Sequence, residues 1–120
     1  MDLYERSEKY KKLMDTVIEE HEDLAWIQGM VSIDCLAADK QKKSDAGYVL
    51  GECIRVKDVY REYCPYDFLI VIYEKNCAGM TEEQLKILMY HELLHVDVGE
   101  KMGNRYIESA LIAFRISEQL

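Results

Sequence analysis

Apolar residues recur three or four positions apart at the start of the chain and gather into short runs further on. Over residues 2–23 they fall on one stripe of an amphipathic helix, made of Tyr10, Leu13, Met14, Val17 and Ile18. Two half-apolar runs follow at residues 30–37 and 48–56, joined by a polar stretch rich in Lys, Ser, Asp and Gly. These runs predict the two strands of a β-hairpin with a longish loop.

A second set of signals lies in the middle of the chain. The segment Phe68–Tyr73 is continuously apolar, which predicts a strand covered on both faces. Thr81 is a suitable helix N-cap, and Gln84 stands where it completes a capping box. Residues 82–98 contain no proline or glycine, and their apolar residues cover most of a helix circumference, so a buried helix is expected. A last helix is expected at residues 108–119.

The order of these elements predicts an α+β fold, with the N-terminal helix and the 82–98 helix packed on a small, mainly antiparallel sheet. A chain of 120 residues is long enough for one core and too short for two, so one domain is expected over residues 1–120. Hydrophobic residues make up 49% of the chain and charged residues 32%, which is typical of a globular protein and not of a disordered one.

Charge and hydropathy exclude several classes of partner. Acidic residues outnumber basic ones by 23 to 15, for a net charge of -8, so the surface repels phosphate backbones and no nucleic-acid partner is expected. No apolar run approaches the roughly 20 residues that span a bilayer, and the N-terminus is too charged for a signal peptide. We therefore expect a cytoplasmic protein without a membrane partner.

The four cysteines are Cys35, Cys53, Cys64 and Cys77. They are spaced too widely for a paired Cys-x-x-Cys zinc clamp, and free thiols are expected. An alternative is that Cys35 and Cys53 face each other across the predicted hairpin and pair under oxidation.

The residues that carry chemistry are His91-Glu92-Leu93-Leu94-His95. Two histidines four positions apart differ by about 40° in direction on a helix, so both can reach one Zn²⁺ ion at about 2 Å. Glu92 lies about 100° round the helix from His91, where a general base takes a proton from metal-bound water. The pattern indicates zinc-dependent hydrolysis of peptide bonds, and the alternative is a chance coincidence of three residues. An ionisable triplet on an otherwise apolar helix favours metal binding, because a buried charge needs a partner.

The chain also resembles a family, the metallopeptidases carried by phages and prophages of bacteria. The resemblance covers residues 23–96 and rests on the Tyr66-Asp67-Phe68 strand entry and on the motif helix that follows Thr81. It implies a minimal zincin-like fold and zinc-dependent proteolysis. Family members place a His-Asp pair downstream, and its histidine looks like the third zinc ligand. Here Ser109 and Ala110 occupy those positions if Phe114 matches the family phenylalanine.

The third ligand must therefore come from elsewhere. On a continuing helix Asp97 points about 200° away from His95, and Glu100 lies about 140° round, so neither shares the histidine face. Glu108 follows two glycines that let the chain turn back, and two histidines with a glutamate form a zinc-peptidase ligand set. Glu108 is our candidate, although it can equally serve as a charge in the first turn of the last helix. His21 is the remaining histidine, and a solvated role suits its charged surroundings better than ligation.

Two functional hypotheses follow. The first is a zinc metallopeptidase with Glu92 as general base, acting on a peptide or protein substrate that extends an edge strand beside the cleft. The second is a noncatalytic descendant of the same fold that acts as a binding or structural module.

Overall fold

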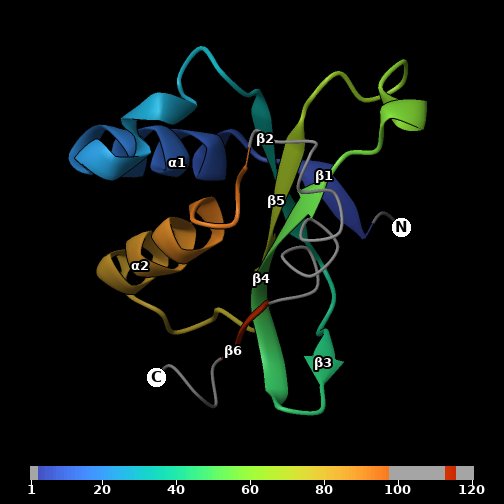
Figure 1. Cartoon of the computed structure of the whole chain (residues 1–120). Helices are drawn as coiled ribbons and strands as arrows, with labels where there is room; N and C mark the ends of the chain where they lie inside the picture. Colours follow the sequence, from blue (N-terminus) through green and yellow to red (C-terminus); the bar gives the residue numbers. More distant parts are fainter. Residues whose placement is uncertain (1–2, 98–112, 116–120) are drawn as a thin grey trace.

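The computed structural model describes residues 3–97 and the backbone of residues 113–115. These residues form a mixed sheet with two α-helices packed on one face (Figure 1), which confirms the predicted α+β class. In chain order the elements are β1 (Tyr4–Arg6), α1 (Glu8–Glu20), the 3-10 helix η1 (Glu22–Ile27), β2 (Ile33–Ala38), β3 (Lys43–Ser44), β4 (Gly47–Arg55), the 3-10 helix η2 (Asp58–Tyr60), β5 (Phe68–Tyr73), α2 (Glu82–Leu93) and β6 (Ala113–Arg115).

The strands lie in the order β1-β2-β5-β4-β3, and β6 also pairs with β4. Within the described part of the chain β2 and β5 are parallel, with Ile33 opposite Phe68, and the other four pairs are antiparallel. The prediction of a mainly antiparallel sheet therefore holds for these residues, with one parallel pair at its centre.

The central strand β5 is buried on both faces, as predicted. Ile70 and Ile72 belong to the core that the helices cover, whereas Val71 and Tyr73 pack in a smaller cluster on the opposite face. Since successive side chains of a strand point to opposite faces, a strand without polar positions is most stable at the centre of a sheet.

The predicted hairpin between residues 30–37 and 48–56 is wrong. The strands in those stretches, β2 and β4, both pair with β5, which lies between them. The polar stretch instead forms a short hairpin between β3 and β4, with Lys43 opposite Tyr48. The doubly apolar β5 gains most burial in the middle of the sheet, and a long polar loop does not hold its flanking strands together.

This strand order also excludes the Cys35–Cys53 disulfide. Both residues are register partners of Ile70, from opposite sides, so their Cα atoms lie about 9.6 Å apart, twice the interstrand spacing. A disulfide requires less than about 7 Å. All four cysteines are free, in agreement with the prediction of free thiols.

Helix α1 begins at Glu8 and not near residue 2, because Tyr4–Arg6 pair with β2 as strand β1. The Ser7 hydroxyl caps the helix by accepting a hydrogen bond from the Tyr10 amide at 3.1 Å. The predicted apolar stripe is confirmed, and its fully buried members are Tyr10, Met14, Val17 and Ile18.

Helix α2 begins with the predicted capping box. The Thr81 hydroxyl accepts from the Gln84 amide at 3.1 Å, and the Gln84 side chain accepts from the Thr81 amide at 2.9 Å. The helix ends at Leu93, earlier than predicted, and it is not buried all round, since Ile87 is 53% and Leu94 is 51% exposed. The sheet and α1 contact two sides of α2, and the third side is open in the described structure.

Close packing of α2 on β4 depends on Gly51. A Cβ atom at this position would lie 3.2 Å from the Val71 carbonyl oxygen and 3.3 Å from the Leu88 side chain. The missing side chain therefore sets how closely the motif helix approaches the sheet.

The strand entry at Tyr66-Asp67-Phe68 joins three segments through Asp67. Its carboxylate accepts a hydrogen bond from the Ser32 amide at 2.8 Å and pairs with the Arg61 guanidinium at 2.6 Å. Its backbone carbonyl accepts from the Val56 amide at 2.9 Å. These bonds close the loop between β4 and β5 at its base.

The last described element, β6, is extended and antiparallel to β4, with Phe114 opposite Gly51. The helix predicted at residues 108–119 is therefore wrong at residues 113–115, and its other positions lie outside the described residues. Pairing satisfies backbone groups on the outer edge of β4 that a helix at these positions would leave without a strand partner.

Candidate metal centre

The motif residues occupy the C-terminal end of α2. His91 is exposed, on the open side of the helix, whereas His95 is partly buried. Glu92 is 0% exposed. A buried carboxylate between two accessible imidazoles differs from an ordinary amphipathic helix, in which the charged residue faces the water.

The backbone keeps turning through the motif after α2 ends. The His95 amide donates to the Glu92 carbonyl at 3.1 Å, and the Val96 amide donates to the Leu93 carbonyl at 3.1 Å. These bonds span three residues, as in a 3-10 turn. Because the chain continues to coil, His95 stays within about one turn of His91.

The electrostatics of the two imidazoles suit metal ligation. Burial lowers the pKa of His95, and the positive charge of nearby His91 lowers it further. Both effects favour neutral imidazole, the form that coordinates a metal ion. A pair of neighbouring neutral imidazoles fits zinc, which prefers nitrogen and sulfur ligands.

Glu92 lies over β4, close to Cys53. Burial raises the pKa of the Cys53 thiol, and the negative charge of Glu92 raises it further. Cys53 belongs to the core under the helices, so the Glu92 carboxylate is directed toward the sheet. The predicted general base is therefore held in the interior between α2 and β4.

Tyr90 ties the motif end of α2 to the N-terminal region. Its hydroxyl donates to the Asp23 carboxylate at 2.6 Å, and this bond raises the pKa of Tyr90. Its ring stacks on His21, with 4.3 Å between centroids, and meets His91 edge-on at 6.3 Å. No sequence pattern marked Tyr90, because it lies outside the motif and Asp23 stands 67 positions earlier.

The third ligand is not among the described residues. Glu108 lies outside them, and no three His, Cys, Asp or Glu side chains in the described part of the chain gather as a metal site. His21 uses its Nδ1 atom on the Val17 carbonyl at 2.9 Å; since a carbonyl only accepts, Nδ1 donates. Asp97 lines a hollow of about 250 Å³ with Arg55 and Arg61 at the end of β4.

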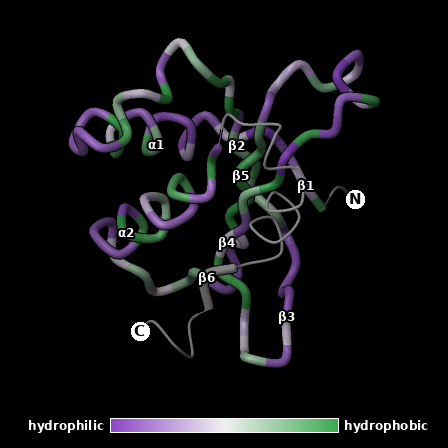
Figure 2. The backbone as a smooth tube through the Cα atoms, viewed as in Figure 1, coloured by the Kyte–Doolittle hydropathy of each residue, from purple (hydrophilic) through white to green (hydrophobic). Residues whose placement is uncertain are grey.

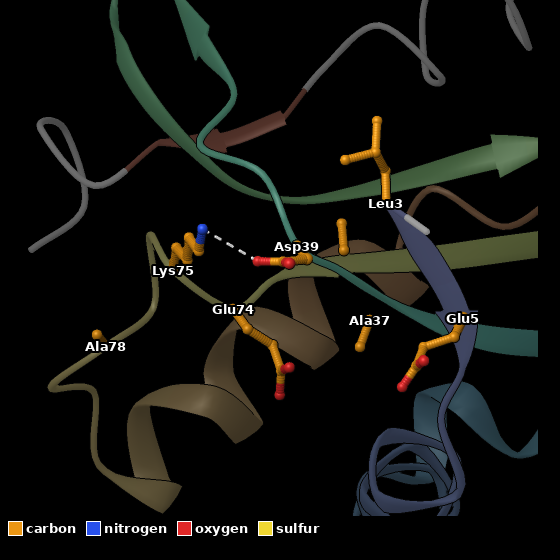
Figure 3. Close-up of a pocket in the computed structure, with 8 residues that line it drawn as sticks. Leu3, Glu5, Ala37, Asp39, Glu74, Lys75 and Ala78 are labelled. Carbon is orange, nitrogen blue, oxygen red and sulfur yellow. Dashed lines mark ion pairs between the residues drawn. The ribbon is translucent and has the colours of Figure 1, made fainter. Parts of the chain in front are cut away.

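A larger hollow of about 490 Å³ lies at the other end of α2 (Figure 3). Its charged lining residues are Glu5, Asp39, Glu74 and Lys75, and Lys75 pairs with Asp39 at 3.1 Å. The hollow adjoins the segment that precedes α2. Twelve helical residues, about 18 Å, separate that end from the motif, so this hollow is distinct from the metal centre.

Comparisons with known proteins bear on the whole chain. A family model described as putative phage metallopeptidase matches residues 2–116, a range that contains the motif and every described strand and helix. Searches of curated proteins and of solved structures found no match. In the described part of the chain, neither helix has the length and apolar character required to cross a bilayer.

Proposed function

The chain belongs to the phage metallopeptidase family, and on that basis we propose that it is a zinc-dependent peptidase that hydrolyses peptide bonds in peptide or protein substrates. Family membership implies a metal and a peptide or protein substrate. The observation that carries the proposal is the pair of accessible imidazoles, His91 and His95, on either side of the buried Glu92.

In this proposal His91 and His95 hold Zn²⁺ through their ring nitrogens, and Glu108 supplies the third ligand. Sequence reasoning supports Glu108, because the two glycines before it let the chain turn back and a carboxylate completes a two-histidine set. When bound, the zinc ion would polarise the substrate carbonyl and lower the pKa of a water molecule toward about 7.

Glu92 is the proposed general base. Its carboxylate accepts a proton from the attacking water and returns it to the leaving amine, so no covalent intermediate forms. Burial between α2 and β4 supports this role, because it keeps bulk water away from the carboxylate and restricts its movement. The α2–Asp23 bond through Tyr90 fixes the helix end from which Glu92 projects.

The decisive test is the zinc content of protein purified without chelator. Wild type is expected to carry, or to take up, about one zinc ion per chain, and His91→Ala is expected to lose it. His21→Ala is the matched control, because it removes a histidine outside the motif. Equal trace metal in wild type and His91→Ala would contradict the proposal and favour a noncatalytic binding module.

The third ligand needs its own experiment. If Glu108 binds zinc, Glu108→Ala weakens zinc affinity markedly while circular dichroism stays unchanged, and Asp97→Ala has no such effect. An unchanged zinc affinity in Glu108→Ala would exclude this residue and leave a two-histidine site completed by water or His21.

A further inference from the structure

The outer edge of β4 is already paired with a strand from the far end of the chain. One edge of β4 bonds to β5, and the other bonds to β3 and then to β6. Residues 98–112 separate α2 from β6 in the sequence. The strand at this edge is therefore a distant segment that folds back, and not a hairpin neighbour (Figure 1).

This paired edge adjoins the motif helix. Phe114 of β6 is the register partner of Gly51, and Gly51 is the position on which Leu88 of α2 packs. β6 also contacts α2 itself. A strand bound to this part of β4 therefore lies next to the helix that carries His91 and Glu92.

The pairing of β6 is short and irregular. β6 has three residues, and its register on β4 shifts between Val49 and Gly51. So short a ladder contributes few hydrogen bonds, and its persistence depends on the tether, which keeps β6 at an effective concentration of roughly millimolar. An untethered peptide with the same pairing pattern competes only at a similar concentration.

We propose that the outer edge of β4 binds an extended peptide in antiparallel orientation and that β6 occupies this edge as an internal pseudosubstrate. Edge strands offer unpaired amide and carbonyl groups that an added strand satisfies. While β6 is paired, it excludes a peptide from the position beside α2. The inhibitory consequence rests on the proposed peptidase function, whereas peptide binding at the edge does not.

The test uses full-length variants that prevent β6 from pairing. Successive amides of a strand point to opposite sides, so one of Ala113→Pro and Phe114→Pro must remove an amide directed at β4. Glu118→Pro, outside the paired residues, is the control. The probe is a fluorescent peptide that copies residues 111–117, and its Kd is measured by anisotropy in the presence of EDTA.

The expected result is that at least one of the two proline variants binds the peptide tenfold or more tightly than wild type and Glu118→Pro. Equal Kd values in all four folded proteins, or no binding to any of them, would overturn the proposal. Because EDTA removes metal, these outcomes do not depend on the zinc site, and zinc loss in the previous experiment would leave them unchanged.

A second measurement uses wild type, so it does not depend on variants that fold. β4 amides facing β6 are expected to exchange hydrogen faster than those facing β5, because they open when β6 leaves, and several millimolar peptide is expected to slow them. Exchange of both sets at one rate, unaffected by peptide, would contradict the proposal. So would a dimer in light scattering that Phe114→Pro dissociates, since β6 would then pair with a second copy.

Discussion

Helices α1 and α2 cover the same face of the sheet, yet they distribute polar and apolar side chains differently (Figure 2). In α1 the residues directed at the sheet are apolar, with Met14 and Val17 fully buried. In α2 a carboxylate, Glu92, is fully buried while Ile87 and Leu94 are exposed. The α1 pattern follows from core packing. The α2 pattern breaks that rule at the motif, as is expected where a site adds its own constraints.

The same difference recurs in the strands below the helices. Cys35 and Cys53 flank Ile70 at equivalent positions of β2 and β4. The Cys35 sulfur contacts the Met14 sulfur at 3.8 Å, an apolar contact under α1, whereas Cys53 lies near the Glu92 charge under α2. Two matched positions in the sheet thus have an apolar neighbour on one side and an ionisable one on the other.

The largest expected effect concerns the buried carboxylate. Glu92→Gln keeps the shape of the side chain but cannot accept a proton, so any peptidase activity should fall by about 10² to 10⁴ while zinc content stays constant. The measurement is cleavage of a protein substrate together with elemental analysis. Glu19→Gln on the exposed face of α1 is the control. A Glu92→Gln protein as active as wild type would remove the functional reason for the contrast between the helices.

Stability should show the reverse contrast. Met14→Ala leaves a cavity under α1 and should cost about 2 to 5 kcal/mol of unfolding free energy. Leu94→Ala removes a half-exposed side chain from the end of α2 and should change stability by less than about 0.5 kcal/mol. Urea denaturation measures both. If Leu94→Ala were as costly as Met14→Ala, the open side of α2 would be covered by other parts of the chain.

The buried thiols predict a loss of stability at alkaline pH. Burial raises the pKa of Cys35 from 9.0 to about 12. The unfolded thiol therefore ionises first, and the stabilisation present below pH 9 is lost as pH rises toward about 12, at up to about 1.4 kcal/mol per pH unit. Unfolding free energies at pH 8 and pH 10 check this. The decrease should be smaller in Cys35→Ala, and an equal decrease would contradict the shift.

The smallest effect is expected at the helix starts. Thr81→Ala removes half of the α2 capping box and should cost about 1 kcal/mol. Ser7→Ala should cost a similar amount at α1, since it removes a comparable bond. Thermal unfolding of both variants compares the two caps. A much larger loss for Thr81→Ala would indicate that the start of α2 also supports the adjoining turn.

Local features of the fold were predictable from the sequence, and the strand order was not. The β5 bounds and the Thr81 capping box depend on residues within a few positions of each other, so their patterns identified them. The parallel pairing of β2 with β5 joins segments about 35 positions apart. No pattern within β2 distinguishes β4 from β5 as its neighbour, and proximity in sequence favoured the wrong one.

The metal centre was predictable to a similar extent. Spacing alone identified His91, Glu92 and His95, because two imidazoles four positions apart on a helix share a face. The exposure of His91 and the orientation of Glu92 toward Cys53 depend on how α2 lies on β4, which Gly51 sets from a distant strand. The assignments of zinc, of the general base and of Glu108 remain predictions.

The three bonds at Asp67 have a consequence for how related sequences are expected to vary. They fix the ends of the β4–β5 loop, while Val59 and Tyr63 within it are 72% and 90% exposed. Insertions and substitutions inside this loop should therefore accumulate freely, since loop closure costs rise slowly with length. An aspartate at its base should persist, because losing it would release three segments at once. The loop is thus the natural place to insert a tag or a foreign segment without disturbing the metal centre.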